Sequence, residues 1–185
     1  MHTYTVEDRV ERLLHGIVCA LTAAFVVAGC GGSGTARKVA SIDVGSAQFE
    51  DGGELPRALS CDGAGTSPEL RWSGVPPKTR EIALLVDDPD AGFEHWTLWG
   101  IDPKAREIQA GQPPSGSKQA DNDAGSRGWT GPCPPAGDAP HHYVFTVRAL
   151  DEPIDASDGA DAGQARDEID AATIAEGKLT GTYGR

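Results

Sequence analysis

The sequence predicts a mostly β fold: an antiparallel, Greek-key-like β-sandwich with one or two short peripheral helices. Three short runs of apolar, β-branched and aromatic residues have the length and composition of strands, at residues 82–86, 96–101 and 143–150. These runs do not alternate regularly with helical segments, which argues against a parallel α/β sheet. The 24 glycines and 13 prolines among 185 residues are typical of a loop-rich β fold and too few to indicate disorder.

Weaker strand signals precede the first of these runs. Residues 42–49 alternate apolar with small polar side chains and predict a first strand. Residues 67–72 predict a short second strand, and we expect Trp72 in the core. Turn-forming residues at 51–56 and 75–78 separate these strands from their neighbours.

The remaining segments differ in character. Residues 102–129 contain many small and polar residues and few large apolar ones, so we expect one long surface excursion. Residues 164–175 carry alanine and isoleucine at three- to four-residue spacing, which predicts a short amphipathic helix. We expect Gly177 to end this helix and residues 179–183 to form an edge strand.

The N-terminus has the composition of an export signal. Arg9 and Arg12 precede an apolar stretch at residues 17–28, which is short for a membrane span but suits the core of a signal peptide. The stretch leads into Val-Ala-Gly-Cys at residues 27–30, which resembles the bacterial lipobox, where the cysteine is acylated and becomes the first residue of the mature protein. The alternative is an ordinary secretory signal that happens to contain Cys30.

We therefore expect three segments. Residues 1–29 would be a lipoprotein signal peptide, and residues 30–41 the lipidated Cys30 with a flexible glycine- and serine-containing tether. Residues 42–185 have the length of one domain with a single core. The protein would then lie in the bacterial cell envelope, lipid-anchored to a membrane, with its domain outside the cytoplasm.

Cysteine content fits an exported protein. Removal of the leader and lipidation of Cys30 leave Cys61 and Cys133, an even pair in an oxidising compartment. A disulfide is one hypothesis, but pairing requires Cα atoms within roughly 7 Å, which the sequence does not reveal. Zinc binding is less expected, because neither cysteine belongs to a CxxC motif.

The chain carries a formal net charge of −12 at pH 7. Such an acidic protein is poorly suited to nucleic acid or to anionic lipid surfaces, because it lacks the cations that neutralise phosphates. Any phosphate binding must come from a local site that works against the overall charge.

Titratable residues are placed at the ends of the three predicted strands. Asp88 follows the first run, His95 precedes the second, and His141 and Tyr143 open the third. These strands could gather an acid, two imidazoles and a phenol at one rim, where their donors would suit a small anion such as phosphate. Strand alternation places His141 and Tyr143 on one face and His142 on the other.

Several motifs resemble one protein family when read in order. They are SPELRWSGVP at 67–76, DPDAG at 88–92, HW at 95–96, GPCPP at 131–135 and HHYVFTVRALD at 141–151. The run closely resembles the phosphatidylethanolamine-binding protein family, nearest to its bacterial Raf-kinase-inhibitor-like branch, over roughly residues 42–185.

The resemblance implies a β-sandwich with a shallow anion-binding pocket and no demonstrated general catalytic activity. Matching motif positions imply a pocket made of six residues: Asp88, His95, Gly131, Pro134, His141 and Tyr143. Gly131 would let the backbone approach an anion, and Pro134 and Pro135 would be rigid walls. Gly92 departs from the proline usual in the family and would loosen the loop after Ala91.

A carboxylate that faced phosphate directly would repel it. We therefore expect Asp88 to hydrogen-bond a pocket histidine and hold it as a charged donor. Asp88 and His95 lie on either side of one short loop, which makes such a geometry feasible. Both imidazoles should gain charge below about pH 6.5 and tighten anion binding. For Asp90 we expect a structural role.

The expected function is that of an exported, membrane-tethered binding protein for a small anion, either phosphate or a phospholipid headgroup, with a possible regulatory role and no cofactor. No GxSxG motif indicates a serine hydrolase, and the chain is not expected to be an enzyme. Two alternatives remain open at this point. One is an inhibitor or regulator of an envelope protease or signalling protein, with an unidentified protein partner. The other is a metal-dependent hydrolase that uses Asp88, His95 and His141.

Overall fold

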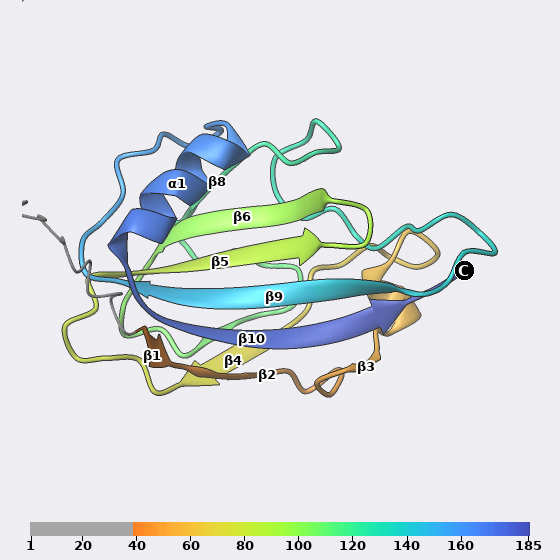
Figure 1. Ribbon diagram of the computed structural model, residues 1–185, viewed down its shortest axis with the longest axis horizontal. Coiled ribbons are helices and arrows are strands. Elements are labelled where there is room, and N and C mark those ends of the chain that lie inside the picture. The colour runs from red at the N-terminus through yellow and green to blue at the C-terminus, as the bar shows by residue number, and fades with distance from the viewer. Residues whose placement is uncertain (1–38) are drawn as a thin grey trace, which may run out of the picture. The chain divides into compact units, whose positions relative to one another are not determined.

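A computed structural model describes residues 39–185 of the chain. The predicted signal peptide, Cys30 and most of the predicted tether lie outside the described residues. The two sheets and the helix of the described part are shown in Figure 1.

A sheet of seven strands dominates the fold, and its four central strands run antiparallel. Two short strands, β1 and β3, pair with β10 in parallel, so the sheet is mixed at that side. The sheet begins two residues before the expected start of the domain at residue 42. In spatial order the path is β1 (Ala40–Ser41), β10 (Thr173–Tyr183), β9 (His141–Leu150), β5 (Glu81–Asp88), β6 (Phe93–Ile101) and β8 (Lys118–Gln119), with β3 (Gly53–Glu54) also beside β10.

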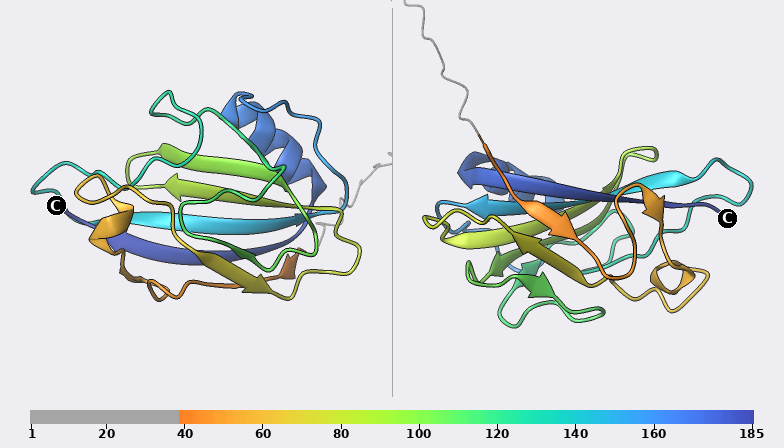
Figure 2. Two further views of the ribbon diagram at one scale, coloured as in Figure 1. Left: turned by 180° about the vertical axis from the view of Figure 1, so that it is seen from behind. Right: turned by 90° about the horizontal axis from the view of Figure 1, so that it is seen from below.

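A smaller antiparallel sheet covers one face of the large one, as Figure 2 shows. It is made of β2 (Asp43–Gly45), β4 (Leu70–Ser73) and β7 (Glu107–Ile108). The main core lies between the sheets, where Trp72 of the small sheet packs in one cluster with residues such as Leu84 and Phe145 of the large sheet. Burial of these apolar side chains is the main source of stability for the sandwich.

The opposite face of the large sheet is covered by helix α1 (Ala162–Ala172). Alternate residues of the central strands, such as Leu85, point to this side and join a second core with Ile169. Asp161 caps the helix, because its carboxylate accepts a hydrogen bond from the backbone N–H of Gln164 at 3.1 Å. A short 3₁₀ helix, η1 (Arg57–Leu59), lies near the other end of the sheet. The predicted fold class, a mostly β sandwich with one or two short peripheral helices, is confirmed.

The C-terminal segment differs from its prediction. The helix ends at Ala172, and β10 then runs without interruption through Gly177 as an inner strand, flanked by β9 and by β1 and β3. The β-branched Thr173 and Ile174 favour the change from helix to strand. Gly177 therefore does not end the helix: its role is to admit the backbone of Ile42, whose carbonyl oxygen would collide with any side chain there.

Residues 102–129 also differ from the expected surface excursion. The segment contributes β7 to the small sheet and β8 to the large one. Ile108, Ala120 and Asn122 within it are buried. The polar composition of the segment gave no indication of these strands and buried residues. Its turns are held by side chain to backbone hydrogen bonds, which a pattern of apolar residues does not reveal.

Candidate functional site

A cavity of about 200 Å³ opens where β5 ends and where β6 and β9 begin, at the right-hand end of the sheet in Figure 1. All six residues implied by the motifs line it: Asp88, His95, Gly131, Pro134, His141 and Tyr143. Five further residues line it: Ala91, Phe93, Thr130, Cys133 and Pro135. Of these, only Pro135 was expected from the sequence. All five lie inside or next to the DPDAG and GPCPP motifs, so motif adjacency was a usable signal.

Strand register explains why residues distant in sequence meet here. β5 lies between β6 and β9 and is antiparallel to both, with Asp88 opposite Phe93 and Asp87 opposite Val144. The end of one strand and the beginnings of its two neighbours therefore share one edge of the sheet.

His95 reaches the cavity through a β-bulge. Val86 pairs with Trp96 and Asp87 pairs with Glu94, so His95 is an extra residue without a partner on β5. Strict alternation would place His95 and Trp96 on opposite faces, but both approach Trp129, with ring centroids 6.3 Å and 6.0 Å from it. The predicted position of His95 in the pocket thus depends on a local irregularity of the strand.

Asp88 is 3% exposed and its carboxylate is fully engaged. Oδ2 lies 2.7 Å from Nδ1 of His141, and Oδ1 accepts hydrogen bonds from the backbone N–H groups of Asp90 and Ala91, each at 3.0 Å. The pocket histidine that contacts Asp88 is therefore His141, and not His95 across the hairpin turn. The hydrogen bond and the charge of Asp88 together raise the pKa of His141 above its ordinary value.

Gly92 completes the hairpin turn that these bonds hold. Its φ is 62°, a left-handed conformation that proline cannot adopt, so proline would not fit this turn. The turn is fixed by the Asp88 carboxylate, in contrast to the looser loop that we expected from the sequence.

His95 has a different environment from His141. It is 5% exposed, and its Nδ1 lies 2.7 Å from the carbonyl oxygen of Thr130. Burial lowers the pKa of His95, and this outweighs the opposing effects of the Thr130 carbonyl and of Asp88. From the sequence we expected the two imidazoles to gain charge together. They do not, because His141 becomes charged at a higher pH than His95.

Tyr143 and His142 lie on opposite faces of β9, as alternation predicts. Tyr143 is buried in the pocket, and burial with the nearby charge of Asp88 raises the pKa of its phenol, which stays protonated at neutral pH. His142 is exposed, and its Nδ1 lies 2.9 Å from Oδ2 of Asp90. Asp90 also accepts the backbone N–H of His142 at 2.6 Å, so it joins the hairpin turn to β9.

The pocket wall formed by residues 131–135 is tied to the loop after η1. The structure joins Cys61 and Cys133 in a disulfide with Cα atoms 5.4 Å apart, and the N–H of Cys61 donates to the carbonyl of Pro132 at 3.0 Å. Gly131 also has a packing role that we did not expect: any side chain there would collide with the carbonyl oxygen of Leu59, so glycine is needed where these loops meet.

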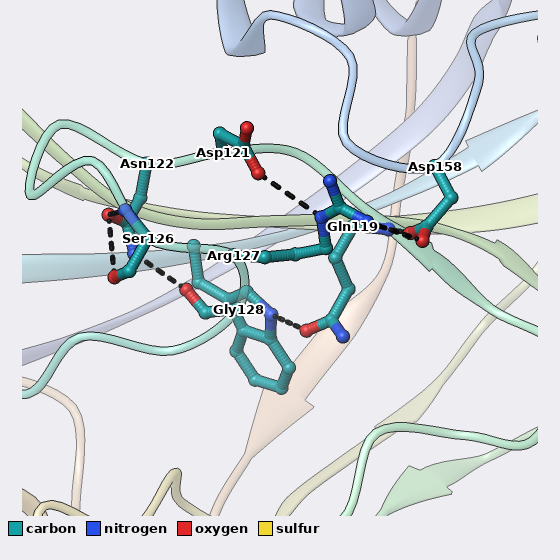
Figure 3. A network of polar contacts seen from close by, with 8 residues as sticks. Gln119, Asp121, Asn122, Ser126, Arg127, Gly128 and Asp158 are labelled. Carbon is teal, nitrogen blue, oxygen red and sulfur yellow. Dashed lines mark hydrogen bonds and ion pairs between the residues drawn. The ribbon is translucent and has the colours of Figure 1, made fainter.

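A polar network behind the pocket holds Thr130 in place, and Figure 3 shows its neighbouring contacts around Asn122. Asn122 is its centre: its amide nitrogen donates to the carbonyl of Gly128 at 2.8 Å and to the hydroxyl of Thr130 at 2.9 Å, and its amide oxygen accepts the N–H of Ser126 at 3.2 Å. Because the Thr130 carbonyl binds the His95 ring, Asn122 positions that ring through Thr130. Sequence patterns gave no signal for this role.

The same network continues to the far side of this loop. Arg127 forms ion pairs with Asp121 at 3.1 Å and with Asp158 at 2.9 Å (Figure 3). Gln119 accepts a hydrogen bond from the indole of Trp96 at 2.7 Å. These contacts fasten the segment around residues 119–128 to β6, which carries His95.

The donor set does not resemble a metal centre. Residues 39–185 contain no group of three or more His, Cys, Asp or Glu side chains placed to hold a metal ion. Nδ1 of His141 faces Asp88 and Nδ1 of His95 faces Thr130, which leaves Nε2 of each ring for a ligand.

Within the described part of the chain, no helix is long and apolar enough to cross a membrane.

Comparison with known proteins agrees with the motifs. The sequence model of a family described as phosphatidylethanolamine-binding protein matches residues 45–184. A protein of Methanothermobacter thermautotrophicus named UPF0098 protein is 39% identical over 145 residues, which cover 74% of this chain and 95% of the relative. A Mycobacterium tuberculosis protein named "Putative lipoprotein LppC" is also 39% identical over 145 residues, covering 77% of this chain and 72% of its own length.

Solved structures show the same architecture. Escherichia coli YbcL, described as a new member of the mammalian PEBP family, superposes with a TM-score of 0.74 at 33% identity, over 78% of this chain and 98% of its own. Chlamydia trachomatis CT736, described as a homologue of phosphatidylethanolamine-binding protein, gives a TM-score of 0.73 at 33% identity, with the same coverage of both chains.

Proposed function

The chain belongs to the phosphatidylethanolamine-binding protein family, and from this premise we propose that its pocket binds a small phosphate-bearing anion, either phosphate or a phospholipid headgroup. One observation carries the proposal: the buried carboxylate of Asp88 holds the His141 imidazole at the cavity through a 2.7 Å hydrogen bond. This arrangement turns the carboxylate away from the ligand and raises the pKa of the imidazole that faces it.

The pocket can attract an anion although the whole chain is acidic. His141 in its charged form offers a charge-assisted donor, and the phenol of Tyr143, which hydrogen-bonds Asp88, stays neutral beside it and adds no negative charge. Proline and aromatic side chains, including Pro134 and Phe93, complete a mostly apolar lining. Such a lining excludes water and strengthens the few polar contacts, which favours binding of a small anion.

Titration of the protein with inorganic phosphate at pH 6 tests this proposal. We expect the ring signals of His95 and His141 to shift in NMR spectra and to saturate with phosphate. The signals of His142, which is exposed on the other face of β9, should shift much less and serve as the internal control. Pocket histidine signals that stay unchanged at millimolar phosphate would contradict the proposal.

We further propose that the protein is exported and anchored by lipid at Cys30, so that the pocket lies outside the cytoplasm. The lipobox-like sequence at residues 27–30 supports this, and so does the relative named a lipoprotein. A single acyl chain gives only marginal membrane binding, so stable anchoring would need more than one chain on this cysteine.

Metabolic labelling with a radioactive fatty acid tests the anchor. Wild-type protein should be labelled, and Cys30→Ser should lose the label, because serine offers no thiol for acylation. Cys19→Ser is the matched control and should keep the label. Label that persists in Cys30→Ser, or wild-type protein released without any label, would show that the leader is an ordinary secretory signal.

A further inference from the structure

The two pocket histidines present opposite hydrogen-bonding characters to a ligand. A backbone carbonyl can only accept, so Nδ1 of His95 carries the proton that it shares with Thr130. In the neutral ring Nε2 is then an acceptor with a free lone pair. Nδ1 of His141 donates to Asp88 in the same way, but in the charged ring Nε2–H is a donor.

Both Nε2 atoms are available to a ligand. Each ring lines the cavity, and among the described residues no hydrogen-bond partner occupies either Nε2. The pocket therefore offers one acceptor, at Nε2 of His95, and one donor, at Nε2 of charged His141, while the phenol of Tyr143 hydrogen-bonds Asp88. A ligand that satisfies both rings must accept a hydrogen bond and also supply one proton of its own.

We infer that the pocket selects a singly protonated phosphate group, such as a phosphomonoester monoanion, over anions that carry no proton. The P–O–H of such a group would donate to Nε2 of His95, while an unprotonated oxygen accepts from Nε2 of His141. This inference rests on the proposed function and narrows it: a phosphodiester, which is the linkage in the headgroup of an intact diacyl phospholipid, has no proton to donate.

The charges around the pocket point the same way. Asp88 lies behind His141, Asp90 and Asp138 also act on His141, and Asp87 and Asp123 act on His95. These carboxylates favour imidazolium at both rings, but burial dominates at His95 and lowers its pKa. Because they also repel a bound anion, a ligand with one negative charge should be favoured over one with two.

A series of small anions tests the inference on the unmodified, full-length protein. Calorimetry at pH 6 should show methyl phosphate binding at least about tenfold more tightly than sulfate or dimethyl phosphate, since each of these leaves a buried acceptor unpaired. Equal binding of methyl phosphate and sulfate would overturn the inference and leave the proposed function intact. Failure of every anion to bind would overturn both.

Proton uptake gives a second readout. The second pKa of a phosphomonoester is about 6, so at pH 8 binding of the monoanion should take up about one more proton than binding of sulfate, measured in buffers of different ionisation enthalpy. Sulfate reports the share of uptake that belongs to His141. Identical uptake for the two anions would show that no ligand proton is required.

A matched pair of variants locates the acceptor. His95→Gln can present an amide N–H where wild type presents a lone pair, so the preference for methyl phosphate over sulfate should fall toward onefold. His142→Gln makes the same change outside the pocket and should keep the full preference. A His95→Gln protein that binds sulfate as poorly as wild type and still prefers methyl phosphate would contradict the role given to His95.

Discussion

Replacing Asp88 with asparagine should lower the pKa of His141 and weaken phosphate binding near pH 7 by roughly 5- to 30-fold, the equivalent of about 1–2 kcal/mol for one charge-assisted hydrogen bond. Asparagine preserves the shape of the side chain, and its amide oxygen can still accept the backbone N–H groups of Asp90 and Ala91 that Oδ1 accepts in the wild type. It removes the charge that raises the pKa of His141.

The pH dependence follows from the sign of this shift. Asp88 raises the pKa of His141, so between the ordinary histidine pKa and the raised one only the wild type keeps the imidazolium. The loss of affinity should therefore be largest near neutral pH and small near pH 5, where solvent protonates His141 in both proteins. The same pair stabilises the fold fully below the ordinary histidine pKa, and this contribution is lost as the pH rises through the raised pKa.

The measurements are an NMR titration of His141 and phosphate calorimetry at pH 7 and pH 5. Asp102→Asn is the matched control, because Asp102 Oδ1 accepts the backbone N–H of Lys104 in a turn, as Asp88 does for its own turn, but Asp102 does not line the cavity. Unchanged ring signals of Phe93, which lines the cavity and does not titrate, would show that the Asp88 variant retains its pocket. Tighter phosphate binding by Asp88→Asn at pH 7 would show that the carboxylate repels the ligand directly.

Loss of the disulfide should have the largest effect on stability. Cys61 and Cys133 are 72 residues apart in sequence, and removing a native disulfide from a small secreted domain typically costs about 2–5 kcal/mol, largely through freedom gained by the unfolded chain. The midpoint of urea unfolding should fall accordingly in a variant with both cysteines replaced by serine.

Reductant supplies the matched comparison. It should lower the urea midpoint of wild type toward that of the double variant, and it should leave the double variant unchanged. Because Cys133 lines the cavity, the double variant should also bind phosphate more weakly as the wall around residues 131–135 loosens. Equal midpoints for oxidised wild type and the double variant would show that the other contacts of this wall suffice.

The fold class could be predicted because its signals are local. The three apolar runs at 82–86, 96–101 and 143–150 lie within β5, β6 and β9, which are the centre of the large sheet. Alternation along one strand is a property of the backbone itself, so the sides of β9 on which Tyr143 and His142 lie followed from their spacing alone. The C-terminal helix was found but its end was misplaced, because the change to β10 depends on pairing with β9 and β1.

The sequence by itself thus determined the central strands, the family and six of the residues that line the pocket, since each depends on residues close together in the chain or on motif positions. Only the tertiary structure decided how those residues act. The bulge at His95, the choice of His141 as the partner of Asp88 and the support of Thr130 by Asn122 are contacts between separate segments. Hydrogen bonds and register between segments depend on how the whole chain packs, and a local pattern carries no record of them.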